Sequence, residues 1–252
     1  MHNSVTRNIF KKCTVYQEEF IKTFGFYLDE LDKLCRLFSD IGLNKSEMKG
    51  LAENDQNIVK TYIFFVESSL TTLIGVLQLL SSNIYSDAYS LLRILYEAAC
   101  LLHYANKSED RKFELYIKFF KSGLSDREHS KGEWQLIKKA EKEYETEKPD
   151  LIPIRQLLNN YGSHISQAKI VHGNVTYIGV GSASQFFTSN FRNNRYLAVL
   201  DMLYFILLMT LEEMAKMYRV YKDISLLQQE ISSLPNKFLQ TIRPKLQDLI
   251  EK

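Results

Sequence analysis

The stretch 86–104, SDAYSLLRILYEAACLLHY, constrains the fold more than any other part of the chain. Read at the helical period, it carries an apolar stripe with spacings of 4, 3, 4 and 3, formed by Leu91, Leu95, Ala98 and Leu102 and continued by Ala105 directly after the stretch. A second, mixed stripe of the same helix holds its only two charged side chains after Asp87, which are Arg93 and Glu97. A helix that is apolar almost all round belongs in the middle of a bundle. We therefore expect Arg93 and Glu97 to be partly desolvated, which costs free energy unless partner groups meet them.

Comparable stripes predict long helices before and after this one, at roughly residues 13–40, at Glu53–Ser81 and from Asn194 to near Lys222. The first has a seam of Phe20, Phe24, Tyr27, Leu31, Leu34 and Phe38. In the last, Asp201 falls on an otherwise apolar seam, where a carboxylate is out of place unless it is paired. These patterns predict an all-α, up-and-down helical bundle.

We divide the chain into a bundle domain at residues 1–222 and a C-terminal helical appendage at residues 223–252. Within the bundle domain, residues 122–150 are rich in charge and are predicted to form a polar helical hairpin or lid. An irregular Gly-rich segment, Tyr161–Asn194, precedes the last core helix. The appendage is predicted to hold two amphipathic helices separated at Pro235.

Composition excludes several classes of protein. With 252 residues, 45% of them hydrophobic, the chain can bury a sizeable core, and a net charge of +2 is too small to indicate nucleic-acid binding by itself. Three widely spaced cysteines give neither a disulfide framework nor a metal pair and fit a reduced cytoplasmic compartment, and no secretory signal is expected. The apolar stretches Tyr62–Leu80 and Leu197–Met214 contain acidic residues, so we expect buried bundle helices and no membrane span. No cofactor or metal is expected.

One candidate site joins Arg93, Glu97, Asp201 and His172. Arg93 and Glu97 are four residues apart and share a helix face. A guanidinium, carboxylates and an imidazole in one cleft could bind phosphate and perform acid–base chemistry. Alternatively, Arg93 bridges Glu97 and Asp201 inside the bundle and fixes helix register.

Two further candidates are weaker. His164 and His172 suit proton transfer near neutral pH, but no Gly-x-Ser-x-Gly elbow, HExxH or GxGxxG motif accompanies them. Basic residues near aromatic ones would suit phosphate contacts with base stacking, or they form an ordinary solvated surface. These basic residues are Lys11, Lys12, Lys138, Lys139, Lys142, Arg192 and Arg195.

The stretch 88–121, AYSLLRILYEAACLLHYANKSEDRKFELYIKFFK, resembles the prokaryotic HEPN-like helical domains, and most of all their uncharacterised DUF5677 branch. The similarity lies in Leu-Leu-Arg with Glu four residues after the Arg, and in Ser166-x5-His172-Gly173-Asn174. The resemblance implies a bundle that is often dimeric and occurs in toxin, abortive-infection and other defence systems. Many members of the superfamily are metal-independent ribonucleases that use Arg-x4-6-His. This chain departs from that motif, because Ile165, Ser166 or Gln167 occupies the Arg position before His172.

Two functions are predicted from these features. The first is an RNA-directed effector of a toxin or defence system, with His172 as general acid or base, Arg93 binding phosphate, Glu97 as a third catalytic residue, and Arg192 and Arg195 guiding the strand. The further binding residues expected are Asn174, Ser166, His164 and Asn160. The alternative is a non-catalytic binding or dimerisation module whose Arg/Glu/His site is structural and whose C-terminal helices bind a partner protein or a second copy. A third idea is a small-ligand or nucleotide sensor on the Gly173–Gly181 loop.

Overall fold

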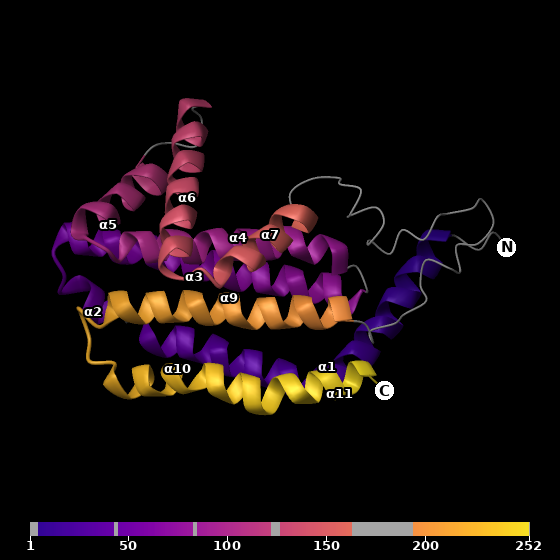
Figure 1. Ribbon diagram of the computed structural model, residues 1–252. Helices are drawn as coiled ribbons and strands as arrows, with labels where there is room; N and C mark the ends of the chain where they lie inside the picture. Colours follow the sequence, from indigo (N-terminus) through magenta and orange to yellow (C-terminus); the bar gives the residue numbers. More distant parts are fainter. Residues whose placement is uncertain (1–4, 43–44, 83–84, 122–126, 163–193, 252) are drawn as a thin grey trace.

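The computed structural model describes residues 5–42, 45–82, 85–121, 127–162 and 194–251, which are helical almost throughout and contain no strand (Figure 1). The prediction of an all-α bundle is therefore confirmed. The helices are α1 Val5–Ile41, α2 Lys45–Lys49, α3 Glu53–Ser81, α4 Tyr85–Ala105, α5 Glu109–Tyr116, α6 Arg127–Glu147, α7 Leu151–Gly162, α9 Asn194–Tyr218, α10 Ser225–Lys237 and α11 Arg243–Glu251. Two short π-helical turns, η1 Ile117–Lys121 and η3 Phe238–Ile242, follow α5 and α10.

Helix α4 lies at the centre of the structure, as its all-round apolar composition predicts. It packs against α3, α6, α7 and α9 (Figure 1). Its fully enclosed side chains include Leu92, Leu95, Tyr96, Ala99 and Leu102. Burial of apolar surface from four directions is the main favourable term that fixes this arrangement. Arg93 is carried into the same interior and is only 8% exposed.

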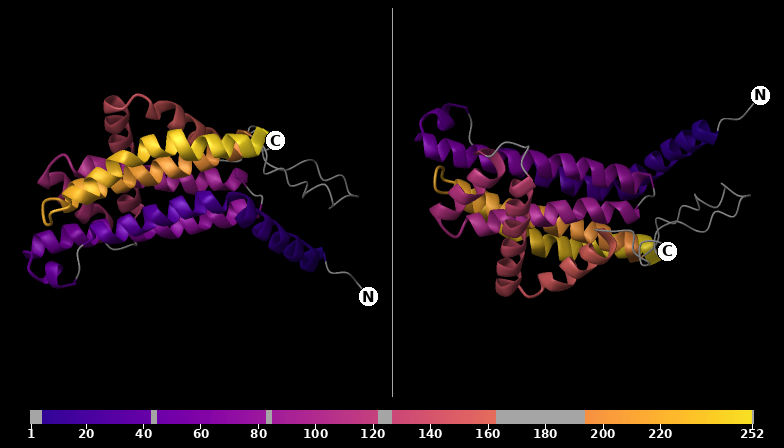
Figure 2. Two further views of the ribbon diagram at one scale, coloured as in Figure 1. Left: turned by 90° about the horizontal axis from the view of Figure 1, so that it is seen from below. Right: turned by 90° about the horizontal axis from the view of Figure 1, so that it is seen from above.

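Helix α1 begins earlier than predicted, at Val5, and is kinked at Phe24, where φ is −109° and ψ is 17°. Its first part points away from the bundle, whereas its second part runs along α3 and α9 (Figure 2). The predicted seam is confirmed, since every member of it is buried: Phe20, Phe24, Tyr27, Leu31, Leu34 and Phe38.

The stretch 122–150, predicted as a polar hairpin or lid, contains one helix among its described residues, α6. Figure 1 shows α6 standing steeply across the direction of the other helices. Its C-terminal half packs on α4 through Leu136, Ala140, Glu141, Tyr144 and Glu145, all buried.

The C-terminal helices share the core with the rest of the bundle. Helices α10 and α11 lie along α9 (Figure 1), and the Phe238 ring stacks on Tyr204 with centroids 4.0 Å apart. Pro235 lies inside α10 and does not separate two helices, because the helix continues through η3 into α11. Packing along the whole length of this helix offsets the local cost of the proline.

Helix α3 has the predicted bounds but is buried on one side only. By length and composition it is the one helix among the described residues that could cross a membrane, and 28% of its most apolar window is buried. The expectation of a buried bundle helix at Tyr62–Leu80 therefore holds for only one side of the helix. The Leu197–Met214 stretch is enclosed, as expected.

Candidate functional site

The first polar cluster lies between α4 and α6 and is centred on Arg93. Its Nε donates a hydrogen bond to Oε1 of Glu97 at 2.8 Å, and its Nη2 donates to Oε1 of Glu141. Glu97 is one turn further along α4, while Glu141 reaches Arg93 from α6 and is 3% exposed. The guanidinium group thus forms ion pairs with two carboxylates, one from α4 and one from α6.

Further charged groups surround the same position. The Tyr96 hydroxyl donates to Oε1 of Glu145 at 3.0 Å, and Arg155 of α7 lies 2.5 Å from that oxygen. Burial raises the pKa of Glu141 above its ordinary value, although Arg93 and Lys138 act in the opposite direction. Three carboxylates are matched by two guanidinium groups and the ammonium group of Lys138, so this cluster lacks the excess of positive charge that attracts a phosphate.

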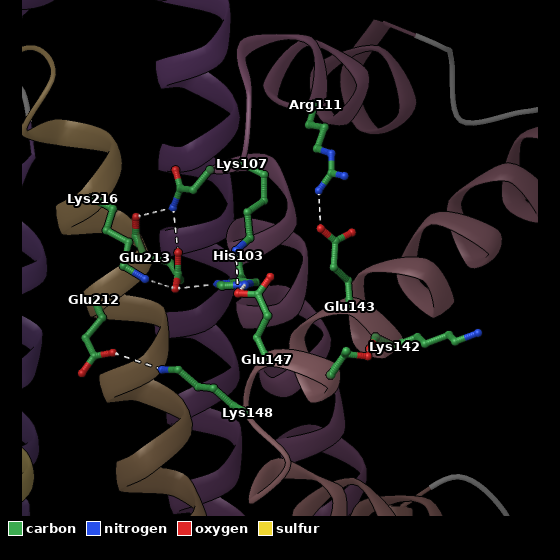
Figure 3. Close-up of polar contacts among 12 residues, drawn as sticks. His103, Lys107, Arg111, Lys142, Glu143, Glu147, Lys148, Glu212, Glu213 and Lys216 are labelled. Carbon is green, nitrogen blue, oxygen red and sulfur yellow. Dashed lines mark hydrogen bonds and ion pairs between the residues drawn. The ribbon is translucent and has the colours of Figure 1, made fainter.

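The second polar cluster lies at the other end of α4 and is centred on His103 (Figure 3). Nδ1 of His103 is 3.0 Å from Oε1 of Glu213 on α9, and Nε2 is 3.1 Å from Oε2 of Glu147 on α6. The imidazole stacks on the Tyr144 ring with centroids 3.9 Å apart. One side chain therefore joins α4, α6 and α9.

Glu213 is the best-satisfied charged group of this cluster. Lys216 donates to Oε1 at 2.6 Å, and Asn106 donates to Oε2 at 2.9 Å. Burial alone would raise the pKa of Glu213, but the hydrogen bonds from His103, Lys216 and Asn106 outweigh it and lower the pKa to about 2. Glu213 is thus a fixed anion that orients the imidazole.

The outer side of the His103 cluster is also occupied. Glu147, which faces Nε2 of His103, lies 2.5 Å from Lys107, and that contact lowers the pKa of Glu147 (Figure 3). A buried carboxylate behind an imidazole is a common arrangement for acid–base catalysis. Here, however, both ring nitrogens face carboxylates, so the arrangement ties helices together and presents no free nitrogen to a substrate.

The structure brings together only part of the predicted site. Arg93 and Glu97 meet as expected, but Asp201 does not join them, because Nε of Arg243 on α11 lies 3.0 Å from Oδ2 of Asp201. Asn160 is exposed near the end of α7. The predicted residues His164, Ser166, His172, Asn174 and Arg192 lie outside the described residues, as do the Gly173–Gly181 loop and the side chain of Arg195.

The predicted basic surface is partly paired. Lys138 is 3.6 Å from Glu141, and Lys139 donates to the Tyr104 hydroxyl at 2.6 Å. Lys142 is exposed (Figure 3), and the side chains of Lys11 and Lys12 lie outside the described residues. Within the described residues, no group of three or more His, Cys, Asp and Glu side chains could hold a metal ion.

Sequence reasoning missed Glu141, Glu145, His103 and Glu213. A signal for Glu213 was available, because it is one of three acids, with Asp201 and Glu212, in the otherwise apolar stretch Leu197–Met214. Glu141 and Glu145 gave no such signal, since they lie among many other charges in a polar stretch.

No family model, curated protein or solved structure matches this chain. The similarity to HEPN-like domains therefore depends on the short motifs given above.

Proposed function

We propose that this chain is a non-catalytic helical binding or dimerisation module, in which the Arg93 cluster is a structural network. The observation that carries the proposal is the double engagement of Arg93 by Glu97 and Glu141. Nη1 of Arg93 has no hydrogen-bond partner among the described residues, but it is buried, so a phosphate could reach this guanidinium only by displacing a carboxylate, and it would face the remaining acids. The cost of such displacement argues against Arg93 as the phosphate-binding group of a nuclease.

A structural role makes a prediction that a catalytic role does not. Removing one member of a buried ion pair costs about 3–5 kcal/mol, whereas replacing both by apolar residues of similar volume is often neutral. We expect Arg93→Met to lower the free energy of unfolding by about 3 kcal/mol. Arg93→Met combined with Glu141→Leu should regain most of that loss.

The experiment is urea denaturation of four variants. They are Arg93→Met, Glu141→Leu, the double variant that carries both substitutions, and a surface control. Arg36→Met is the matched control, because Arg36 forms an exposed pair with Asp32 at 2.5 Å. It should change stability by less than about 1 kcal/mol. The proposal requires the double variant to keep the oligomeric state of the wild type, and a folded double variant with altered mass in light scattering would contradict it.

The resemblance to HEPN-like domains supports a second candidate, an RNA-directed effector of a defence system that acts as a metal-independent ribonuclease. Its support is the Ser166-x5-His172-Gly173-Asn174 segment. The test is incubation of the pure protein with RNA in the presence of EDTA. Cleavage that His172→Ala abolishes and the Arg93→Met, Glu141→Leu double variant retains would establish a catalytic site independent of the Arg93 cluster; cleavage unchanged by His172→Ala would remove this mechanism.

A further inference from the structure

A groove of 330 Å³ lies where α1, α3 and α9 meet. Small-molecule sites commonly lie between the helices of a bundle, and they are concave, mostly apolar and about 300–1,000 Å³ in volume. The groove is therefore at the lower end of the size range for a small organic ligand. Its apolar lining comprises Phe38 of α1, Ile63, Val66 and Leu70 of α3, and Met214 and Tyr218 of α9.

This apolar lining has a buried floor and one half-buried side. Phe38, Met214 and Tyr218 are at most 4% exposed and form the floor. The three lining residues of α3 are half-buried, and their spacings of three and four residues place them along one strip of that helix. A molecule in the groove would contact apolar side chains from three helices, and burial of its own apolar surface would favour binding.

One charged residue lines the groove, and it is Glu67. Glu67 is exposed, directly follows Val66 on α3 and forms no ion pair with another described residue. Its carboxylate is therefore an unpaired negative charge at the edge of an apolar recess. A ligand with an apolar body and one positive charge complements both features.

Tyr218 adds a second polar group to the lining. The residue is 1% exposed, and its hydroxyl forms no hydrogen bond with another described residue. Burial raises the pKa of Tyr218, so the hydroxyl keeps its proton near neutral pH. A phenolic hydroxyl both donates and accepts hydrogen bonds, so it is available to a polar group of a molecule in the groove.

We propose that this groove binds a small organic ammonium compound, whose apolar chain or ring contacts Phe38, Val66 and Leu70 and whose ammonium group lies at Glu67. Other classes of ligand satisfy fewer features of the site. A neutral apolar molecule leaves the carboxylate without a partner, and a carboxylate or phosphate ester is repelled by it. The inference goes beyond the proposed function, because the groove contains no residue of the Arg93 cluster.

The first test is isothermal titration calorimetry of the full chain with 2-phenylethylammonium. The neutral 2-phenylethanol and the anionic 3-phenylpropanoate have similar shapes and serve as controls for charge. The ammonium compound should bind with a dissociation constant of about 1 mM or tighter. The alcohol should bind about three- to fivefold more weakly, and the carboxylate about tenfold or more. Equal affinities for the three compounds, or no binding of the ammonium compound at about 10 mM, would overturn the inference.

Charge variants test the role of Glu67 in the same titration. Glu67→Gln should weaken binding of 2-phenylethylammonium about three- to fivefold, and Glu67→Lys about tenfold or more, because the lysine adds a repulsion. Glu53→Gln is the matched control, since Glu53 is an exposed acid of the same helix that does not line the groove. It lies about 21 Å away along the helix, beyond the Debye length, and should leave the affinity unchanged. An equal loss in the control, or no loss in Glu67→Lys, would contradict the proposal.

The second test locates the ligand with Cys35 as a reporter. Cys35 lines the groove and is half-buried, whereas Cys100 is enclosed. In a Cys13→Ser background, iodoacetamide should therefore modify Cys35 in preference to Cys100, as mass spectrometry would show. At about ten times its dissociation constant, 2-phenylethylammonium should slow this modification about tenfold, because only about a tenth of the sites are then empty. Binding without protection of Cys35 would place the ligand elsewhere and overturn the inference.

Filling the groove provides variants that leave the charge of the protein unaltered. Val66→Trp and Leu70→Trp each place a large ring in the groove from a half-buried position, and each should abolish both binding of the probe and protection of Cys35. Two variants are used because the cost of overpacking depends on the site, and circular dichroism identifies the variants that remain folded. A folded variant that still binds the probe would overturn the inference. A folded variant with an altered oligomeric mass would assign the groove to a second copy of this chain and overturn it as well.

Failure of this inference can be distinguished from failure of the proposed function. Absence of ammonium binding, or binding insensitive to Glu67→Lys, overturns only the assignment of the groove. RNA cleavage lost on both Arg93→Met and the Arg93→Met, Glu141→Leu double variant would overturn the structural role of Arg93 and leave the calorimetry unaffected.

Discussion

Glu141 and Glu213 are two buried glutamates that contact the same central helix and differ in almost everything else. Their exposed fractions are 3% and 0%, and they face α4 from α6 and α9. The pKa of Glu141 is raised, whereas that of Glu213 is lowered to about 2. Burial penalises the charged form of both, so burial does not explain the difference.

The difference lies in the neighbours of each carboxylate. Glu213 accepts hydrogen bonds from Lys216 and Asn106 and lies against His103. Glu141 has Arg93 as its close partner, and Glu97 and Glu145 add negative charge nearby. A buried carboxylate is stabilised as an anion only when enough donors converge on it and few like charges surround it.

The largest expected effect comes from removing the well-satisfied carboxylate. Glu213→Ala removes the carboxylate that faces Nδ1 of His103 and accepts from Lys216, while Asn106 keeps its hydrogen bond to the backbone carbonyl of residue 213, and it should lower the free energy of unfolding by about 3–5 kcal/mol. Glu212→Ala is the matched control, since Glu212 is a neighbour on α9, is 30% exposed and lies 3.8 Å from Lys148. The control should cost less than about 1 kcal/mol in urea denaturation, and equal losses would show that the His103 cluster has no special role.

The pH dependence of stability tests the same carboxylate without removing its side chain. The folded pKa of Glu213 is about 2, below its ordinary value of 4.5, so its contribution is complete above pH 4.5 and is lost as the pH falls toward 2. The shift corresponds to about 3 kcal/mol.

Glu213→Gln should remove this part of the acid limb, which is the fall in the free energy of unfolding between pH 4.5 and pH 2. Denaturation curves collected from pH 6 to pH 2 would show the change. Glu141→Gln should leave it in place. If both variants keep the wild-type acid limb, Glu213 is not the group responsible.

The ionisation of Glu141 should change stability in the opposite direction to that of Glu213. Because its folded pKa is raised, the charged form costs stability once the pH exceeds the ordinary value of 4.5. Glu141→Gln keeps a hydrogen-bond acceptor for Arg93, which also retains Glu97. At pH 7 this substitution should therefore cost less than Arg93→Met, about 1 kcal/mol, and a loss comparable to that of Glu213→Gln would remove the distinction between the two clusters.

The sequence predicts the fold well wherever one stripe determines burial. Helix α3 has its predicted bounds, and α4 differs by one residue at each end from the predicted 86–104. The C-terminal stretch is different, because its apolar stripe indicates that a face must be covered but not which surface covers it. That surface is α9, an element that precedes the appendage and belongs to the bundle core.

The candidate site was predictable only in part for the same reason. The burial of Arg93 follows from the helix that carries it, and its pairing with Glu97 follows from their spacing. Its second partner, Glu141, depends on the steep approach of α6, which no local pattern encodes. Asp201 is paired as expected of a carboxylate on an apolar seam, but with Arg243 of α11.

The smallest expected effect compares two buried tyrosine hydroxyls near the His103 cluster. The Tyr62 hydroxyl donates to Oδ1 of Asn106 at 2.9 Å, whereas the Tyr144 hydroxyl has no hydrogen-bond partner among the described residues. Tyr62→Phe removes a bond and leaves the Asn106 oxygen unpaired, so it should cost about 1 kcal/mol. Tyr144→Phe keeps the ring stacked on His103 and relieves an unsatisfied group, so stability should change by less than about 0.5 kcal/mol or rise. Thermal denaturation of the two variants side by side compares their stabilities. A larger loss of stability for Tyr144→Phe than for Tyr62→Phe would mean that the Tyr144 hydroxyl has a hydrogen-bond partner in solution. The His103 cluster would then extend further than these contacts.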